Sequence, residues 1–379
     1  MTADITLRGP GDVLAVLPYQ LGYHPRNSIV VISLRGRLVG LVARTDLPTE
    51  DDAATAVDAL VGPLVRDGAT SVLVVGYEDE PDASQPALVA LVEQVEAKGI
   101  DVVHVVVVRD GRWYSPICSD PCCPPEGTPL ADPADVPGVA EFVARGRSPL
   151  TSRDAVETLV APDPSAGEGV REAVAARSGL PRRRRRAAAA WRILLRHREP
   201  GEGERRGGGS IVASPAVLAD ALSGLADIAW RDGLVAWLAP GLLPLEVLDR
   251  SVVALMSTEL PTWAGMGPAR RAAARRGPSE GGASGARHDQ DRHELLQRLL
   301  ALCRCVPDDC RDEAAALCTV TAHVAWEAGD GAVARAAVDR ALRLAPGYRL
   351  ARLLEKVVEA GVRLPVDEDR DGPAAAQVG

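Results

Sequence analysis

Residues 29–43, IVVISLRGRLVGLVA, decide the fold class of the first part of the chain. Two nearly unbroken apolar runs flank Arg35-Gly36-Arg37, which is the pattern of a β-hairpin whose strands are buried on both faces. Such strands need helices on each side, because a face open to water would carry polar residues at every second position. The stretch therefore predicts a hairpin inside an α/β sheet.

Further elements are expected on both sides of this hairpin. Apolar residues at helical spacing predict three helices: Asp12 to Gly22 with a bend or an end near Pro18, Thr49 to Gly68, and Pro86 to Gly99. Three more apolar runs predict strands at 72–75, 102–108 and 113–117, with Asp110-Gly111 as a tight turn between the last two. We expect an N-terminal α/β domain, a three-layer sandwich around a mixed five-stranded sheet.

The order of these elements resembles the core of the cytidine-deaminase-like fold. Zinc deaminases place a His (or Cys), x, Glu triplet at the start of the second helix and Pro-Cys-x-x-Cys at the start of the third. The corresponding segments here are 45–50, TDLPTE, and 80–85, EPDASQ, and neither contains His or Cys. The resemblance concerns the fold, and the missing zinc ligands argue against deaminase chemistry.

The rest of the chain is expected to form a mainly α-helical C-terminal region. Segment boundaries follow from composition: 1–130 is the α/β domain, 131–264 a helical region with a basic segment at 177–206, 265–292 a flexible linker, 293–365 a helical hairpin domain and 366–379 a disordered acidic tail. The spacing of Ala334, Ala341 and Pro346 matches a tetratricopeptide-like repeat. An ordinary helical hairpin explains the same pattern. In both cases apolar spacing predicts a seam between two antiparallel helices, with side chains of the next helix packed against it. The predicted seam residues are Ala322, Ala325, Ala334, Val338, Ala341 and Leu342, and those packed against them are Tyr348, Leu350, Leu353 and Leu354.

Charge is distributed unevenly along the chain. Residues 1–130 carry 9 Lys/Arg and 18 Asp/Glu, whereas residues 131–379 carry 34 of each. An acidic surface repels nucleic acid and anionic lipid unless a basic stripe overrides it. The segment 177–206 holds 11 Arg and 3 Glu. Trp191 is the only aromatic residue among these arginines that could stack on a nucleic-acid base. A solvated face that pairs with the acidic N-terminal domain is therefore favoured over nucleic-acid binding.

The loop 19–28, YQLGYHPRNS, is the first candidate site. Binding residues collect in polar loops at the edge of a rigid sheet, and an anionic or polar ligand is expected to contact His24, Arg26, Asn27 and Ser28, with Arg44 and Asp46 as an edge-of-sheet pair. The alternative is a structural turn in which Pro25 fixes the chain direction and Ser28 bonds to local backbone.

The second candidate site consists of cysteines. Cys118, Cys122 and Cys123 lie in a proline-rich loop and can approach one zinc ion, with His104 or Glu126 as a fourth ligand. A redox pair and buried structural thiols are the alternatives. A second set, Cys303, Cys305, Cys310, Cys318 and His323, has the irregular spacing of core residues, and no disulfide is expected between the two sets. No cofactor is expected other than this zinc.

Several stretches resemble the bacterial domain-of-unknown-function family 4192: LRGPGDVL at 7–14, LGYHPRNSIVV at 21–31, the loop 118–127, and the C-terminal segments 326–332, 341–342 and 346–351. The resemblance covers most of the chain and is weakest from about position 160 to 300. The family has no assigned activity to carry over. The resemblance implies that the loops at 25–28 and 118–123 belong to the family pattern, which favours them as sites.

These observations predict a class of function and no reaction. The chain lacks a complete catalytic signature, an N-terminal signal peptide and any run near the roughly 20 apolar residues of a membrane span. We expect a cytoplasmic, non-catalytic binding or adaptor protein, with an α/β ligand-binding domain and another protein bound through residues 312–360. Nucleic acid and membranes are not expected partners. The alternative is a metal- or thiol-dependent enzyme that uses Cys118, Cys122 and Cys123.

Overall fold

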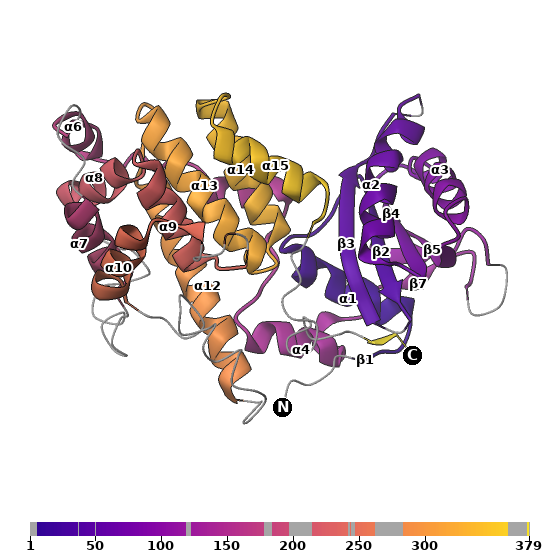
Figure 1. The fold of residues 1–379 in the computed structure, drawn as a ribbon. Coiled ribbons are helices and arrows are strands. Elements are labelled where there is room, and N and C mark those ends of the chain that lie inside the picture. The colour runs from indigo at the N-terminus through magenta and orange to yellow at the C-terminus, as the bar shows by residue number, and fades with distance from the viewer. Residues whose placement is uncertain are drawn as a thin grey trace. The chain divides into compact units, whose positions relative to one another are not determined.

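The computed structural model describes residues 6–36, 38–49, 51–118, 123–177, 184–196, 214–241, 243, 247–261, 283–362 and 377–378. The chain divides into two compact units (Figure 1). The α/β unit contains the described residues 6–153, 359–362 and 377–378, and so extends beyond residue 130. The helical unit contains those from 154 to 358.

A mixed sheet forms the middle of the α/β unit. Within the described ranges its strand order is β1-β8-β3-β2-β4-β5-β6-β7. Six strands form its body: β3 (Leu38–Asp46), β2 (Ser28–Arg35), β4 (Ser71–Tyr77), β5 (Asp101–Arg109), β6 (Arg112–Tyr114) and β7 (Thr128–Pro129). The two-residue strands β1 (Thr6–Leu7) and β8 (Gln377–Val378) lie beyond β3. Within the body β4 and β5 are parallel and the other neighbours antiparallel.

The prediction of five strands is wrong in number. All five predicted strands are present, and β7, β1 and β8 were missed. A two-residue strand is too short to show a hydrophobic period, so only its partner in the folded chain identifies it.

Helices cover both faces of the sheet, as the apolar strands predicted (Figure 1). Successive side chains of a strand point to opposite faces. Accordingly, Val30 packs in one core with residues of α1 (Pro10–Leu21) and α4 (Pro137–Ala144). Val31 packs in a second core with residues of α2 (Ala53–Asp67) and α3 (Gln85–Glu96). The three-layer arrangement is therefore confirmed.

The starts of α1 and α2 differ from the prediction, whereas the ends of both helices agree with it. The N-cap of α1 is Gly9 rather than Asp12, because Pro10 suits the first turn, where no N–H donor is needed. The same helix continues through Pro18 to Leu21. Glycines at 22 and 68 end α1 and α2 with φ of 82° and 72°, values that favour a residue without Cβ.

The α2 start and the β5–β6 turn also depend on local chemistry. Helix α2 starts at Ala53, and the Thr49 hydroxyl bonds the Asp52 carboxylate at 2.8 Å instead of capping the backbone. The predicted tight turn between β5 and β6 consists of Asp110 and Gly111, with φ of 52° and 70°. Positive φ at both positions is what a two-residue hairpin requires.

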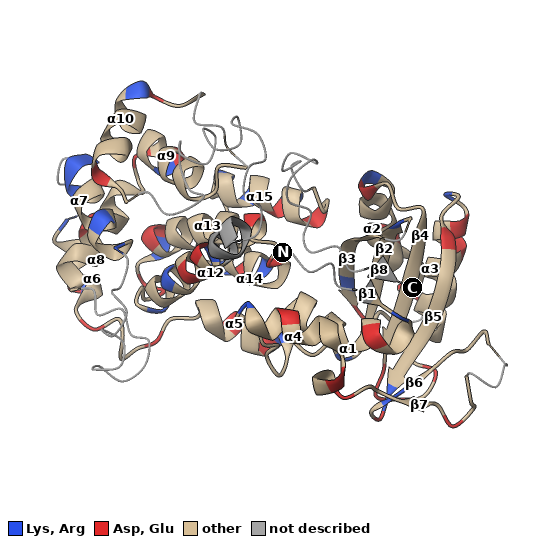
Figure 2. Ribbon diagram, turned by 90° about the horizontal axis from the view of Figure 1, so that it is seen from below, with Lys and Arg blue, Asp and Glu red and all other residues tan. Residues whose placement is uncertain are grey.

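The helical unit carries interspersed basic and acidic residues (Figure 2). Its described helices are α5 (Arg153–Val160), α6 (Val170–Ala175), α7 (Arg184–Leu194), α8 (Pro215–Gly224), α9 (Ile228–Leu238), α10 (Arg250–Glu259), α12 (Ala283–Arg304), α13 (Arg311–Glu327), α14 (Gly331–Leu344) and α15 (Arg349–Glu359). Three tryptophans, Trp191, Trp230 and Trp237, are fully buried in it. No helix in the described parts of the chain is long and apolar enough to cross a membrane.

Two predicted segments lie largely outside the described residues. Positions 283–292 of the predicted linker 265–292 belong to α12, and the earlier part of that linker is not described. Of the predicted tail 366–379, the structure describes only residues 377 and 378, which form β8.

Helices α13 and α14 pack against each other along small residues. The predicted seam residues Ala322, Ala325, Ala334, Val338 and Ala341 are buried, and Leu342 is half-buried. The prediction that Leu353 packs against this seam is wrong, since that side chain is 59% exposed. In α15 the buried residues are Ala351 and Leu354, three positions apart, which leaves Leu353 on another side of the helix.

Candidate functional site

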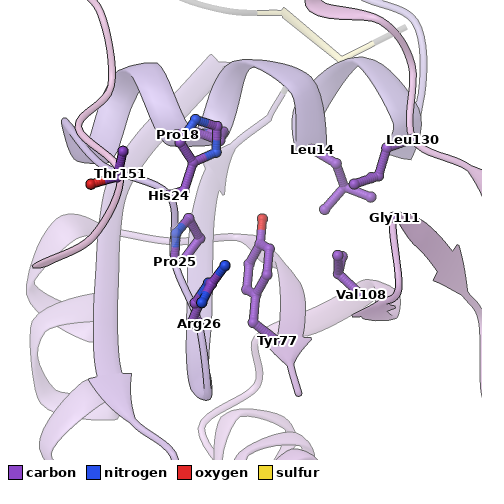
Figure 3. Close-up of a pocket in the computed structure, with 10 residues that line it drawn as sticks. All are labelled: Leu14, Pro18, His24, Pro25, Arg26, Tyr77, Val108, Gly111, Leu130 and Thr151. Atoms are coloured by element: carbon purple, nitrogen blue, oxygen red, sulfur yellow. The ribbon is translucent and has the colours of Figure 1, made fainter. Parts of the chain in front are cut away.

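A cavity of about 480 Å³ lies in the α/β unit at the carboxyl ends of the parallel strands β4 and β5 (Figure 3). We call it the β4–β5 pocket. Its described lining residues are Leu14, Pro18, His24, Pro25, Arg26, Tyr77, Val108, Gly111, Leu130 and Thr151. The loop before β2 reaches this edge because β2 is antiparallel to β4. Carboxyl ends of parallel strands are a common place for ligands in α/β proteins.

Backbone hydrogen bonds fix the loop that carries His24 and Arg26. The His24 amide donates to the Leu150 carbonyl at 2.9 Å, and the Leu150 amide donates to the Gly22 carbonyl at 2.8 Å. At the other end of the loop, the Leu47 amide donates to the Asn27 carbonyl at 2.8 Å. The lining side chains of the loop therefore stand on a positioned backbone.

Asn27, a predicted ligand contact, ties this loop to the end of β4. Its Nδ2 donates to Asp79 Oδ2 at 2.7 Å, and its Oδ1 accepts from the Asp79 amide at 3.0 Å. The backbone at Asn27 is left-handed, with φ of 38°, a conformation that asparagine tolerates better than most residues. Its side chain thus positions the loop.

Three polar side chains of the lining have no hydrogen-bond or ion-pair partner in the described part of the chain. His24 and Arg26 are exposed, and neither side chain has a hydrogen-bond or ion-pair partner there. Tyr77 is only 8% exposed, and its hydroxyl points into the cavity without a described hydrogen-bond partner (Figure 3). Burial raises the Tyr77 pKa, so the phenol stays protonated and can donate.

Ser28 lies beside Tyr77 at the same end of the sheet. It is the register partner of Tyr77 in β4 and of Asp46 in β3. Its side chain is fully buried, and Oγ has no described hydrogen-bond partner. The alternative in which Ser28 bonds to local backbone is therefore wrong.

Arg44 and Asp46 form the expected pair at the end of β3. Arg44 Nη1 lies 2.6 Å from Asp46 Oδ1, and Arg153 Nη1 lies 2.8 Å from Asp46 Oδ2. Arg44 Nη2 also donates to the Arg26 carbonyl at 3.4 Å. The pair thus supports the loop from outside the pocket lining.

Tyr77 is one of the pocket residues that the sequence did not predict. It follows the apolar run 72–75 and precedes an acidic stretch, so the pattern marks it only as the end of a strand. The available signal was a tyrosine, an apolar ring with a polar end, at the carboxyl end of a buried strand.

Glu78, the next residue, is a buried carboxylate that the sequence analysis also missed. It accepts from the Ser84 amide at 2.8 Å and the Ser84 hydroxyl at 2.6 Å, and Arg109 Nη1 lies 2.8 Å from it. The Arg109 guanidinium also stacks 4.9 Å from the centroid of the Tyr114 ring. With its oxygens occupied in this way, Glu78 joins β4, β5 and the start of α3.

The cysteine loop is only partly described. Cys118 and Cys123 are half-buried, and Cys122 lies outside the described residues. His104 is half-buried, which lowers its pKa. Within the described ranges no group of three or more His, Cys, Asp and Glu side chains could hold a metal ion. A metal or thiol site at Cys118, Cys122 and Cys123 stays a prediction.

The second cysteine set lies in the helical unit. Cys303 and Cys318 are fully buried with their sulfurs 4.0 Å apart, and Cys303 Sγ lies 3.3 Å from Thr321 Oγ1. Burial lowers the pKa of His323 to about 4, so the ring is neutral near pH 7. These residues belong to a packed core, as their spacing predicted.

Arginines of the basic segment 177–206 pair with acids of the helical unit itself. Arg177 contacts Asp220 at 2.5 Å, Arg184 contacts Asp227 at 2.7 Å and Arg192 contacts Glu259 at 2.8 Å. For these arginines the expected pairing with the acidic N-terminal domain is wrong, because α8, α9 and α10 supply nearer carboxylates. Trp191 is buried and unavailable for base stacking. Residues 178–183 and 197–206 lie outside the described ranges.

Comparison with known proteins identifies the family. A family described as a domain of unknown function (DUF4192) matches residues 10–252 and 283–364. No curated protein and no solved structure matches the chain. All described residues that line the β4–β5 pocket fall within the first matched range. Because the two matched ranges together cover most of the sequence, the chain belongs to the DUF4192 family.

Proposed function

We propose that this is a non-catalytic binding protein whose α/β unit holds a small molecule in the β4–β5 pocket. The observation that carries the proposal is the Tyr77 hydroxyl, which is buried, faces the cavity and has no described hydrogen-bond partner. A ligand that accepts a hydrogen bond from this hydroxyl gains about 0.5–1.5 kcal/mol of net stabilisation.

The composition of the lining favours binding over catalysis. Its described residues include no carboxylate and no thiol. A catalytic histidine normally has a partner that sets its tautomer and orientation, and the described residues supply none for His24. The lining does contain aliphatic surface with a few polar groups, which is the usual make-up of a ligand pocket.

The finer features of the fold belong to the same proposal. We assign the α/β unit the cytidine-deaminase-like order of elements, used as a scaffold for binding. The segments 45–50 and 80–85 lack His and Cys, which supports a role without deaminase zinc. A cytoplasmic location is part of this proposal.

The helical unit is proposed to contact another protein through residues 312–360. Buried alanines at 334 and 341 let α13 and α14 approach closely, which supports a tetratricopeptide-like hairpin. The exposed Leu353 and Arg349 of α15 are candidate contacts. In a pull-down, L353D/R349E should lose the partners recovered by the wild type at an unchanged melting temperature. Identical recovery by both proteins would contradict the adaptor role.

A fragment screen by ligand-observed NMR tests the pocket in the full chain. Thr151 is exposed on the lining, so T151W should fill the cavity with little effect on folding. Thr158 is exposed in the helical unit, and T158W is the matched control. Fragments that bind the wild type and T158W but not T151W are expected. A screen without any such fragment would contradict binding in this pocket.

A further inference from the structure

We infer that the ligand of the β4–β5 pocket is a small organic acid, whose carboxylate or phosphate is held by Arg26, His24 and the Tyr77 hydroxyl. Its apolar body lies against Leu14, Val108 and Leu130. The inference rests on the proposed function, to which it adds the chemical class of the ligand.

The first argument is the charge of the pocket. Arg26 is the one arginine or lysine among the described lining residues, and no Asp or Glu accompanies it there. Two acids beside this loop have other partners: Asp46 pairs with Arg44 and Arg153, and Asp79 bonds Asn27. An uncompensated guanidinium over a cavity is a binding group for an anion.

The sequence around Arg26 is acidic overall. Residues 1–130 contain twice as many acidic as basic residues, 18 against 9. In this unit Arg44 and Arg109 are paired with carboxylates. Arg26 lacks one in the described residues while its loop is held by backbone bonds on both sides. The structure thus places a positive group at the pocket without neutralising it.

The second argument is that polar and apolar residues line opposite sides of the pocket. His24, Arg26 and Thr151 lie on one side of the Tyr77 ring, and Leu14, Val108 and Leu130 lie on the other (Figure 3). A ligand that fits both sides needs a polar end and an apolar end. A bare inorganic anion would leave the aliphatic side unfilled, and a neutral hydrocarbon would leave the donors unpaired.

The third argument is the direction of the hydrogen bonds. A protonated phenol and a guanidinium both have N–H or O–H groups to give, and a carboxylate or phosphate only accepts. Tyr77 as a whole residue is only 8% exposed, and its hydroxyl faces the cavity (Figure 3). Hydrogen bonds to a charged acceptor are stronger than those between neutral groups.

Matched acids and amides test the inference by isothermal titration calorimetry on the full chain. The probes are naphthalene-2-carboxylate, its carboxamide, phenyl phosphate and inorganic phosphate. We expect an acid to bind about tenfold or more tightly than the carboxamide. Comparing naphthalene-2-carboxylate with phenyl phosphate distinguishes the two acid groups, and inorganic phosphate should bind more weakly than phenyl phosphate.

Variants locate the preference in the pocket. R26Q should weaken acid binding about tenfold without changing carboxamide binding, and R26K should retain part of the preference. Y77F should weaken acid binding. Arg35 is exposed at the opposite end of β2, so R35Q is the matched control and should bind like the wild type.

Equal affinity for acid and carboxamide, or an R26Q variant that keeps the acid preference, would overturn the inference and leave pocket binding intact. Failure of all acids to bind at millimolar concentration would also overturn it. The proposed function itself fails only if the T151W fragment screen also finds nothing.

Discussion

Ser28 of β2 lies opposite Tyr77 of β4 in the antiparallel register. Both residues belong to the sheet face that α1 covers, since Val30, two positions after Ser28, and Tyr77 itself pack in that core. The two side chains therefore start next to each other at this end of the sheet, and Ser28 Oγ is buried there without a described hydrogen-bond partner. This end is where the β4–β5 pocket opens.

The first prediction is that removing the Ser28 hydroxyl does not destabilise the α/β unit. Because Oγ is buried without a described partner, S28A should leave the free energy of unfolding unchanged or raise it by about 1 kcal/mol. Chemical denaturation of the full chain measures it.

Ser33 on the same strand is the matched control. It is equally buried, but its Oγ accepts from the Leu41 amide at 2.8 Å and donates to the Asp67 carboxylate. S33A should cost about 1–2 kcal/mol. Equal losses for S28A and S33A would show that Ser28 has a partner in solution.

The sequence predicts the fold well where an element depends on residues close to it in the chain. The hairpin at 29–43, the glycine ends at 22 and 68, and the Asp110-Gly111 turn each depend on neighbouring residues, and each is confirmed. Strand β8 pairs with β1 and β3, far away in sequence. No local pattern encodes such a pairing.

The candidate site was predictable in part, for the same reason. A polar loop between a helix and a buried strand pointed to His24 and Arg26, which line the cavity. Tyr77 was missed because its position beside that loop follows from the antiparallel register of β2 and β4. Asn27 was predicted as a ligand contact, but its bonds to Asp79 appear only once β4 ends beside the loop.

The second prediction concerns pH. Burial lowers the pKa of His323 from 6.5 to about 4, an effect that Arg231 reinforces and Asp232 opposes. The folded state thus favours the neutral ring, which contacts the Thr319 carbonyl at 2.8 Å. Its contribution to stability is complete above pH 6.5 and is lost as pH falls from 6.5 to about 4, by about 3 kcal/mol.

The variant H323N removes this titration. The wild type should therefore lose more unfolding free energy than H323N between pH 6.5 and 4.5, measured by denaturation followed through tryptophan fluorescence. Parallel pH profiles for the two proteins would contradict a buried neutral His323.

The third prediction concerns the α13–α14 seam. Ala334 is fully buried between two helices that approach closely, so A334L should overpack the seam and cost about 1–3 kcal/mol. Ala332 lies in the first turn of the same helix and is half-buried, which makes A332L the control, with a smaller loss. Thermal unfolding measures both. A larger loss for A332L would mean that the seam adapts to added volume.

The last prediction separates two arginines of α14 that share one carboxylate. Arg340 and Arg343 both contact Asp308, at 2.9 and 3.0 Å. Arg340 is only 3% exposed and also donates to the carbonyls of Cys303 at 2.8 Å, Val306 at 2.6 Å and Val160. Arg343 is exposed, with its described hydrogen bond made to Asp308 alone.

Lysine keeps the charge at either position but cannot reproduce the planar fork of five donors. R340K should therefore leave buried carbonyls unpaired where α5, α12 and the start of α13 meet, and cost about 2–4 kcal/mol. R343K changes a solvent-screened pair and should cost under about 0.5 kcal/mol. Denaturation of both variants measures the difference. Similar losses would mean that Arg340 stabilises the helical unit through its ion pair with Asp308 and not through its hydrogen bonds to buried carbonyls.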